Sequence, residues 1–498
     1  MEVELKLLLA AQDNDKLLHH PLLGTPTRVQ QLAARYFDTP DLHLMRHGAG
    51  LRVRKIDGEW IQTMKAGGSV QSGLHSRNEW EGAVDRSWPR LGKLRKLIGD
   101  DDHWLAILDA PDLKDRLEAL FVVDVERHLW EVEVDGNRIE VALDVGHIER
   151  KSHRVPVNEI ELELKEGDAA GLYALALQLL EDIPLRISNI NKAQRGYMLV
   201  RETGHAPYRA QAVKLPSDAG MAQAFSAILD NCIQHIQRNE LAVVEGHDPE
   251  TLHQMRVGVR RLRSALKLFD ALAPCTPQLA EDIAWLGTQL GTARDWDVLL
   301  SSTLSRVEAA PGGRHGMMDV QALALATAQA KRREAAQAIL SPRYTRLMLT
   351  LGVWMLHTAP LLHGVAASFS RHTLQTLHKK MLKRAHRMDN GDPASAHRTR
   401  IATKRGRYAL EFFHALYRDK GARAYLQALA AAQEELGQHN DLVVAERLLQ
   451  ELAQQHADAA GAIQFARGYL VAQQAAQPAD LATLRDSLQA LRLPHLKH

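Results

Sequence analysis

Cysteine is almost absent from the sequence, and so are the features of a secreted or membrane-spanning chain. Cys232 and Cys275 are the only cysteines among 498 residues, and they lack the paired spacing of a zinc site or a disulfide framework. We expect both to be buried as small apolar side chains. The apolar stretch 347–365 is interrupted by polar and helix-breaking residues, and Glu2 and Glu4 stand where a secretory signal would be basic. We therefore expect a cytoplasmic protein with no membrane partner.

Aromatic residues and net charge are also scarce. Only 5% of the residues are aromatic and the formal net charge is +2, so any basic site has to come from local clustering of charge. The contents of hydrophobic residues (45%) and charged residues (24%) are typical of soluble globular proteins. A chain of this length is too long for one ordinary core, and we expect several domains.

The chain divides into two halves with different hydrophobic periods. Residues 1–202 alternate between apolar and polar in short segments, which predicts mainly strands. Residues 218–498 are rich in Ala, Leu, Gln and Arg, with apolar residues spaced by three and four, which predicts helices. Residues 203–217 contain prolines and mixed polar residues that break both patterns. The prediction is an α+β domain, a linker and an all-α domain, in that order.

Most of the predicted strands have one charged face. Alternation puts the acidic or basic residues at 2, 4 and 6 on one side of the first strand, and those at 159, 161 and 163 on one side of a later strand. Such faces could be solvated on an open antiparallel sheet. However, neighbouring like charges are costly unless counterions intervene. Closing the sheet into a barrel would bring acidic and basic faces into one lumen suited to metal and phosphate.

These segments resemble CYTH domains, also called triphosphate tunnel metalloenzymes. Glu2-Val3-Glu4-Leu5-Lys6 is similar to the ExExK signature of the family, and further motifs follow in the family's order over about residues 1–200. They are Tyr36-Phe37-Asp38-Thr39-Pro40, Leu51-Arg52-Val53-Arg54, Thr63-Met64-Lys65, the strand ending at Asp144, Glu161-Leu162-Glu163-Leu164 and Asn191-Lys192-Ala193-Gln194-Arg195-Gly196-Tyr197. Asn191 departs from the pattern, because many relatives have Ser there.

The resemblance implies an eight-stranded antiparallel tunnel with flanking helices that holds a linear triphosphate along its axis. It implies that basic side chains bind phosphate oxygens: Lys6, Arg52, Arg54, Lys65, Arg77, Arg127, Arg138 and Lys192. It also implies that carboxylates ligate Mg²⁺ or Mn²⁺: Glu2, Glu4, Asp144, Glu161 and Glu163. Glu4 or Glu163 would accept the proton of the attacking water, and Lys6 completes the implied catalytic set.

The helical half contains an internal repeat, because residues 253–269 align without gaps with residues 397–413. Basic residues recur in both copies at helical spacing: His253, Arg256, Arg260, Arg263 and Lys267, then His397, Arg400, Lys404 and Arg407. A second repeated element follows at 290–297 and 436–441, and its acids are expected to orient arginines or cap helices. The stripes could be solvated faces. Their duplication, and the lack of an acidic partner at i+4 in the first four turns of the first stripe, favour anion binding.

The repeat resembles the CHAD domain over roughly residues 218–498. The resemblance implies two pseudo-symmetric four-helix bundles, at about 218–310 and 318–498, which enclose a basic channel for inorganic polyphosphate.

We therefore predict a metal-dependent inorganic triphosphatase that releases pyrophosphate and phosphate, joined to a domain that binds polyphosphate. One alternative is an adenylyl cyclase or a nucleoside or thiamine triphosphatase, but no aromatic cluster among the tunnel motifs indicates a base or thiazole pocket. Another is a protein that binds polyphosphate without hydrolysing it, which would not require acids in the lumen. Nucleic acid is disfavoured, because aromatic residues do not interleave with the basic stripes.

Overall fold

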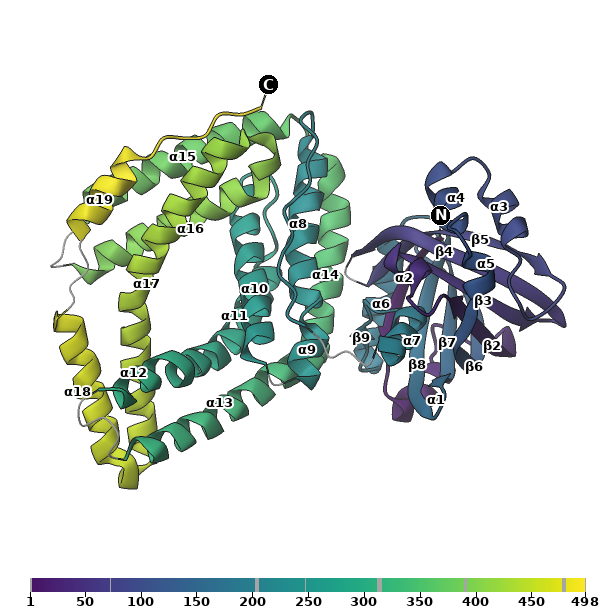
Figure 1. The fold of residues 1–498 in the computed structure, drawn as a ribbon, viewed down its shortest axis with the longest axis horizontal. Coiled ribbons are helices and arrows are strands. Elements are labelled where there is room, and N and C mark those ends of the chain that lie inside the picture. Colours follow the sequence, from purple (N-terminus) through teal and green to yellow (C-terminus); the bar gives the residue numbers. More distant parts are fainter. Residues whose placement is uncertain are drawn as a thin grey trace. The chain divides into compact units, whose positions relative to one another are not determined.

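The computed structural model describes residues 2–71, 73–201, 206–246, 248–310, 316–388, 392–476 and 481–497. The chain forms two compact units, one made of Met1–His205 with Leu340–Leu356 and the other of Ala206–Ile339 with His357–His498 (Figure 1). Among the described helices, none combines the length and the apolar character that crossing a bilayer requires.

A closed antiparallel sheet forms the body of the first unit. Its strands are β1 (Glu2–Leu8), β2 (Arg28–Asp38), β3 (Ala49–Ile56), β4 (Glu59–Gln71), β5 (Leu74–Val84), β6 (Glu118–Val134), β7 (Asn137–Arg150), β8 (His153–Glu166) and β9 (Arg186–Ile187). They pair in the order β5-β4-β3-β2-β6-β7-β8-β1, and β1 closes the ring by pairing with β5. The two-residue strand β9 adds only to the end of β1. The predicted eight-stranded antiparallel barrel is therefore confirmed.

The strand register carries the charged faces into the lumen. Residues paired directly across antiparallel strands point to the same side of the sheet, and β1 pairs Glu4 with Glu163 and Lys6 with Glu161 on β8. The intervening apolar residues, such as Leu5, point outward and are fully buried. Side chains of opposite charge thus meet inside the barrel, and the apolar core lies outside it.

Short helices cover the outer faces of the barrel. They are α1 (Asn14–Leu18), α2 (His43–Arg46), α3 (Leu91–Ile98), α4 (Asp102–Leu108), α5 (Leu113–Arg116), α6 (Ala170–Asp182) and α7 (Lys192–Arg201). Leu172, Leu175 and Leu179 of α6 are fully buried in the same core as Leu5. Trp104 of α4 is buried in a second core cluster on the barrel.

Residues 342–356 of helix α14 (Pro342–Thr358) belong to the first unit, although they come from the helical half of the sequence. Its Leu349 is fully buried in the core that contains Tyr173 of α6, and Thr345 Oγ1 donates a hydrogen bond of 2.7 Å to the carbonyl of Leu185. At Gly352 a Cβ would lie 2.7 Å from the Tyr173 ring. The absence of a side chain at Gly352 therefore permits this close approach.

The second unit consists of helices and short turns in its described residues, which confirms the predicted all-helical domain. The helices are α8 (Met221–Gln237), α9 (Glu240–Glu245), α10 (Pro249–Phe269), α11 (Pro277–Val298), α12 (Ser305–Glu308), α13 (Met317–Leu340), α15 (Ala366–His386), α16 (Pro393–Phe413), α17 (Asp419–Gln455), α18 (Ala460–Ala476) and α19 (Leu481–Ala490). Within the expected break between bundles, at about 309–317, residues 311–315 lie outside the described residues.

The internal repeat appears as the helices α10 and α16, each 21 residues long. Each begins with a proline, preceded by an aspartate that caps the first turn: Asp248 accepts from the N–H of Glu250, and Asp392 accepts from the N–H of Ala394. The two helices pack together, and Arg260 Nε of α10 donates to Tyr408 Oη of α16 at 2.6 Å.

Most of the segment expected to be a linker is held against the second unit. Residues 203–205 lie outside the described residues. Beyond them, Val213 and Leu215 are buried, and the side chain of Asn239 bonds both the N–H and the carbonyl of Tyr208 at 2.9 Å.

Candidate functional site

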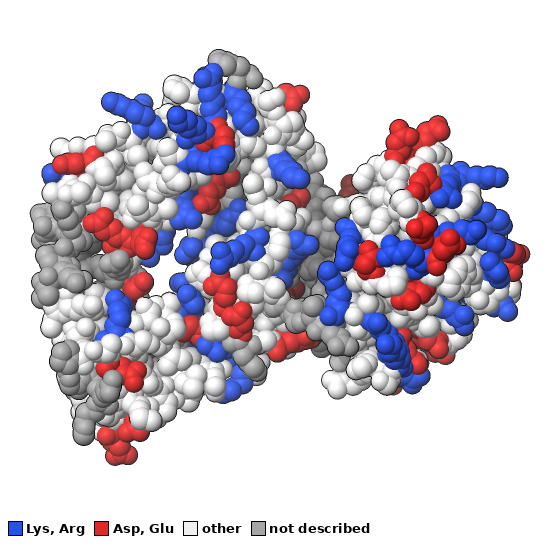
Figure 2. Space-filling model, in the orientation of Figure 1, with Lys and Arg blue, Asp and Glu red and all other residues white. Residues whose placement is uncertain are grey.

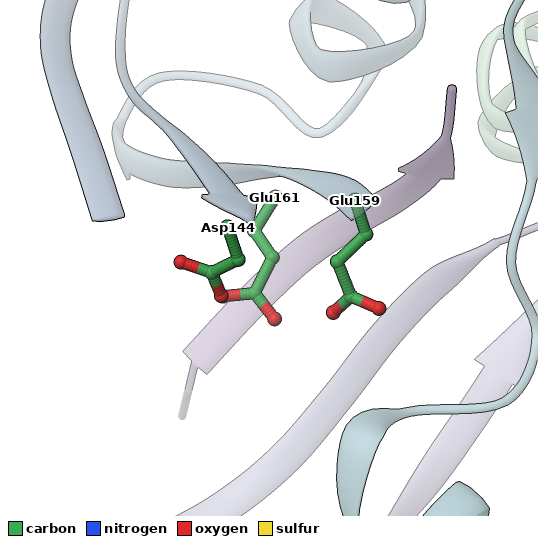
Figure 3. Close-up of side chains that lie close together, drawn as sticks. All are labelled: Asp144, Glu159 and Glu161. Atoms are coloured by element: carbon green, nitrogen blue, oxygen red, sulfur yellow. The ribbon is translucent and has the colours of Figure 1, made fainter. Parts of the chain in front are cut away.

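Three carboxylates from neighbouring strands converge inside the barrel. Asp144 of β7 and Glu159 and Glu161 of β8 each offer an oxygen within 4.8 Å of the others. Figure 3 shows the three side chains leaving their strands toward the same side. Asp144 and Glu159 are completely inaccessible to solvent. This acidic cluster provides oxygen ligands only, which suits a hard divalent cation such as Mg²⁺ or Mn²⁺.

Buried cations neutralise the acidic cluster. Lys192 Nζ lies 2.7 Å from Asp144 Oδ2 and 3.0 Å from Glu161 Oε1, and it also pairs with Glu159. Arg127 bonds Asp144 Oδ1 and Glu161 Oε2, each at 2.6 Å. Burial alone would raise the pKa of Glu161, but Lys192, Lys6 and Arg127 hold it well below its ordinary value. Lys192 and Arg127 lower the pKa of Asp144 as well, so Asp144 and Glu161 are ionised at neutral pH.

A second group of acids lies along β1 and β8. Lys6 Nζ is 2.8 Å from Glu4 Oε2, Lys65 Nζ is 2.5 Å from Glu2 Oε2, and Lys165 Nζ is 2.8 Å from Glu163 Oε1. Burial raises the pKa of Glu163, and the nearby charges of Glu2 and Glu140 raise it further despite Lys165. Glu163 therefore lies near like charges, and a bound cation would offset their repulsion.

Another part of the lumen wall carries arginines, and some of their N–H groups donate no hydrogen bond to a described residue. Arg52 and Arg54 of β3 have buried Nε atoms without a hydrogen-bond partner among the described residues. Burial, and then the neighbouring charge of Arg52, lowers the pKa of Arg54 to about 10. On β5, burial lowers the pKa of Arg77. Unused buried donors next to like charges indicate a site for an anion.

One basic residue that was expected to bind phosphate lies apart from the others. Arg138 is 43% exposed and pairs with Glu166 instead of joining the buried cations.

In the second unit, the two repeated helices α10 and α16 bring basic side chains close together. The basic quartet consists of Arg256 and Arg260 from α10 and Arg400 and Lys404 from α16. Burial, and after it the charges of Arg400, Arg260 and Arg256 in that order, together lower the pKa of Lys404 to about 7. Four cations from two helices are therefore close enough to repel one another.

Acids and unused donors surround the basic quartet. Asp295 of α11 lies 3.8 Å from Arg256 Nη2, and Asp441 of α17 acts electrostatically on Arg256 and Arg400. Buried atoms without a hydrogen-bond partner in the described residues include Arg400 Nε and His253 Nδ1. In Figure 2, Lys and Arg side chains gather at the edge of an opening through this unit. The arrangement suits a polyanion.

Four other residues of the predicted stripes lie outside the quartet. Arg263 and His397 are exposed. Lys267 is 61% exposed and pairs with Asp270, while Arg407 pairs with Glu411 at 2.7 Å.

Both units contain a segment that matches a known protein family. Residues 1–197 match the CYTH domain and residues 227–450 match the CHAD domain. The chain belongs to the proteins that join a CYTH domain to a CHAD domain.

Individual relatives cover one domain each. An inorganic triphosphatase of Haemophilus influenzae is 34% identical over 201 residues, which are 40% of this chain and 54% of that protein, so the chain spans about half the length of this curated relative. The crystal structure of the CHAD domain from the plant Ricinus communis has a TM-score of 0.57 and 71% sequence identity, and the match covers 59% of this chain and all (100%) of that one. HpAC1 from Hippeastrum is described as having a dominant triphosphatase activity. The match has a TM-score of 0.30 and 19% identity, and it covers 41% of this chain and 96% of that chain, so nothing about this chain rests on it.

The structure adds lumen residues of the CYTH domain that sequence reasoning missed. Glu159 is fully buried and pairs with Lys192 and Arg195. Its place on the same alternating face as Glu161 was the available signal. His75 of β5 is also buried in the lumen, and it belongs to none of the quoted motifs.

Proposed function

We propose that the CYTH domain hydrolyses inorganic triphosphate to pyrophosphate and phosphate with Mg²⁺ or Mn²⁺, and that the CHAD domain binds inorganic polyphosphate. The observation that carries the proposal is the lumen of a closed barrel in which buried lysines and arginines occupy the same space as ionised carboxylates. A simple anion site would not contain the carboxylates, and a simple cation site would not contain the lysines.

In this proposal the cations and the carboxylates divide the ligands between them. Phosphate oxygens are held by Lys6, Arg52, Arg54, Lys65, Arg77, Arg127 and Lys192, with Arg138 at an exposed position. The divalent ion is held by Glu2, Glu4, Asp144, Glu161 and Glu163, to which the geometry adds Glu159. When Lys192 turns to a phosphate oxygen, it releases oxygens of the acidic cluster. A bound divalent ion supplies charge neutralisation for the phosphoryl group under attack.

Proton transfer requires a carboxylate near the attacked phosphorus. Glu4 and Glu163 are direct neighbours across β1 and β8, and both point into the lumen. Burial raises the pKa of Glu163, which makes it a better proton acceptor than an ordinary carboxylate, while Glu4 is the more buried of the two. Lys6, ion-paired to Glu4, would stabilise charge on the reacting phosphoryl group.

The CHAD domain is proposed to bind polyphosphate through the basic quartet, with His253, Arg263, Lys267, His397 and Arg407 extending the surface. We propose that its halves are two pseudo-symmetric bundles, since α10 and α16 share length, cap and facing arginines. The burial of Lys404 and Arg400 supports the proposal, because closely spaced cations without a polyanion repel one another.

Phosphate release by the purified full-length protein tests the proposal. The substrates are tripolyphosphate, ATP, thiamine triphosphate and long-chain polyphosphate, each with Mg²⁺, Mn²⁺ or EDTA. Metal-dependent release from tripolyphosphate in preference to ATP and thiamine triphosphate is expected. Preference for ATP would favour a nucleotide-specific enzyme, with cyclic AMP as the next product to assay, and no release from any substrate would favour a binding protein.

A further inference from the structure

Helix α15 of the second unit carries a row of exposed cations that is separate from the basic quartet. The four residues are Lys379, Lys380, Lys383 and Arg387, and we call them the α15 stripe. At 3.6 residues per turn they share one side of the helix, and they extend over about 12 Å of its length. Met381 and Ala385 are buried on the opposite side. In Figure 2, Lys and Arg side chains gather along the edge of this unit where Figure 1 places α15.

The α15 stripe has no acidic counterpart. The sequence contains neither Asp nor Glu from residue 335 to residue 388. Among the described residues, none forms an ion pair with a stripe cation. Other exposed arginines of the unit do have acidic partners, such as Arg398 with Asp392 and Arg447 with Glu451. A helix face that serves only to contact water usually alternates the two signs of charge. The stripe therefore has a charge pattern suited to an anionic partner.

The internal repeat identifies the helix that corresponds to α15 in the first half of the unit. The gap-free alignment of residues 253–269 with 397–413 extends back to α8 and α15, and it matches Phe225 with Phe369. Each ring packs edge-on against the phenylalanine that ends the following helix. Phe225 lies 5.2 Å from Phe269, and Phe369 lies 6.1 Å from Phe413, between ring centroids. Helices α8 and α15 are therefore equivalent elements.

The equivalent faces of these two helices differ in character. In α8 the residues on this face are apolar and fully buried: Ile228, Cys232 and Ile236. The matching residues of α15 are polar and exposed: His372, Thr376 and Lys380. An apolar contact face in the first half of the unit thus corresponds to an exposed cationic face in the second half.

The composition of the α15 stripe indicates the kind of anion. Three of its four cations are lysines, whose ammonium groups attract phosphate as point charges. Residues 371–387 contain no aromatic residue on which a nucleic-acid base could stack. They also expose no apolar side chain that could enter a bilayer. A linear polyanion that offers charge alone therefore fits the stripe best.

We propose that the α15 stripe binds the part of a long polyphosphate chain that extends beyond the basic quartet. The inference rests on the proposed function of the CHAD domain. Helix α15 packs against α16, which carries Arg400 and Lys404 of the quartet. A chain already held at the quartet meets the stripe at a high effective concentration, so even a weak contact there adds to the affinity.

The test variant combines Lys379→Gln, Lys380→Gln and Lys383→Gln in the full-length protein. Glutamine favours helices about as well as lysine and removes only the charge.

The control variant removes the same charge from exposed positions elsewhere in the unit. It combines Arg306→Gln, Arg333→Gln and Lys420→Gln. This control separates a local contact from a general loss of positive charge.

The measurement is the association constant for long-chain polyphosphate, and for a chain of a few phosphates, over a range of salt concentrations. We expect the test variant to bind long chains about tenfold more weakly, a modest loss for each of three exposed contacts. Its plot of log K against log salt should be shallower by about 2, at about 0.7 for each lost contact. Binding of the short chain, hydrolysis of tripolyphosphate and the melting temperature should match the wild type.

Unchanged long-chain affinity in the test variant, an equal loss in the control variant, or an equal loss for short chains would overturn the inference and leave the proposed function intact. The inference would also fail if the test variant lost binding to duplex DNA or to phosphatidylserine vesicles but kept its affinity for polyphosphate. A wild-type protein that binds no polyphosphate would overturn both the inference and the proposed function of the CHAD domain.

Discussion

Polyphosphate binding by the CHAD domain should weaken steeply above neutral pH because of Lys404. In the free protein, burial and then the charges of Arg400, Arg260 and Arg256 lower the pKa of this lysine from 10.5 to about 7. A bound polyanion favours the charged ammonium group and moves the pKa back toward its ordinary value. The folded protein must therefore take up a proton on binding whenever the pH lies between these two values.

The magnitude follows from the two pKa values. Below pH 7 Lys404 is already charged, and its contribution to affinity is flat. Above pH 7 the association constant should fall about tenfold per pH unit, and at pH 8 binding should take up about 0.9 proton. Burial lowers the pKa of His253 to about 4, so this histidine stays neutral and adds nothing in the same range.

Titration calorimetry of the full-length protein with long-chain polyphosphate measures both quantities. The experiment runs from pH 7 to pH 9 at constant ionic strength, in pairs of buffers with different enthalpies of ionisation. Lys404→Arg is the control, because a guanidinium group stays charged throughout and should remove the dependence on pH. A wild-type affinity that is flat over this range, or a slope that persists in Lys404→Arg, would refute the reasoning.

Three further predictions concern each site and the packing of the first unit. Glu4→Gln should abolish phosphate release from tripolyphosphate with little change in melting temperature, and full turnover in this variant would remove Glu4 from the reaction. Arg256→Ala combined with Arg400→Ala should weaken polyphosphate binding but spare hydrolysis, and unchanged affinity would show that the quartet is not the site. Gly352→Ala should destabilise the full-length protein by about 1–3 kcal/mol in chemical unfolding, because the added Cβ would lie 2.7 Å from a tyrosine ring of α6. Its control is Gly468→Ala in α18, where nothing lies within 4 Å; that change should stabilise the protein by up to about 1 kcal/mol, and equal effects of the two substitutions would contradict the packing argument.

Alternation was sufficient to predict the barrel and the inward faces. A period of two determines which side chains share a face, and charges repeated on strand after strand leave few arrangements except a closed lumen. Alternation does not give the depth of a residue along its strand. Arg138 follows the same alternation as Asp144, yet it is 43% exposed while Asp144 is fully buried. Depth depends on register and closure, which only the complete set of strand pairings defines.

Other features were beyond sequence reasoning because they depend on segments far apart in the chain. Lys192 and Glu159 are separated by 33 positions, and their pairing arises where α7 meets β8. The position of α14 is a stronger case. Its apolar residues are compatible with burial against any partner, and nothing local indicates that Leu349 enters the core of the CYTH unit.

The ion pairs in the lumen explain how the CYTH domain tolerates so many buried charges before it binds a ligand. An isolated buried carboxylate is costly, but Asp144, Glu159 and Glu161 share Lys192, and Arg127 and Arg195 supply further ion pairs, so none of the three charges is left unpaired. The same ion pairs would couple the binding of a triphosphate to the binding of a divalent cation. On the proposed function, a triphosphate that draws Lys192 away would leave three acids without this partner, and a divalent cation that occupies those acids would free Lys192 to bind phosphate. Each ligand would therefore remove an electrostatic obstacle to the other, and an exchange of ion-pair partners would make their binding cooperative.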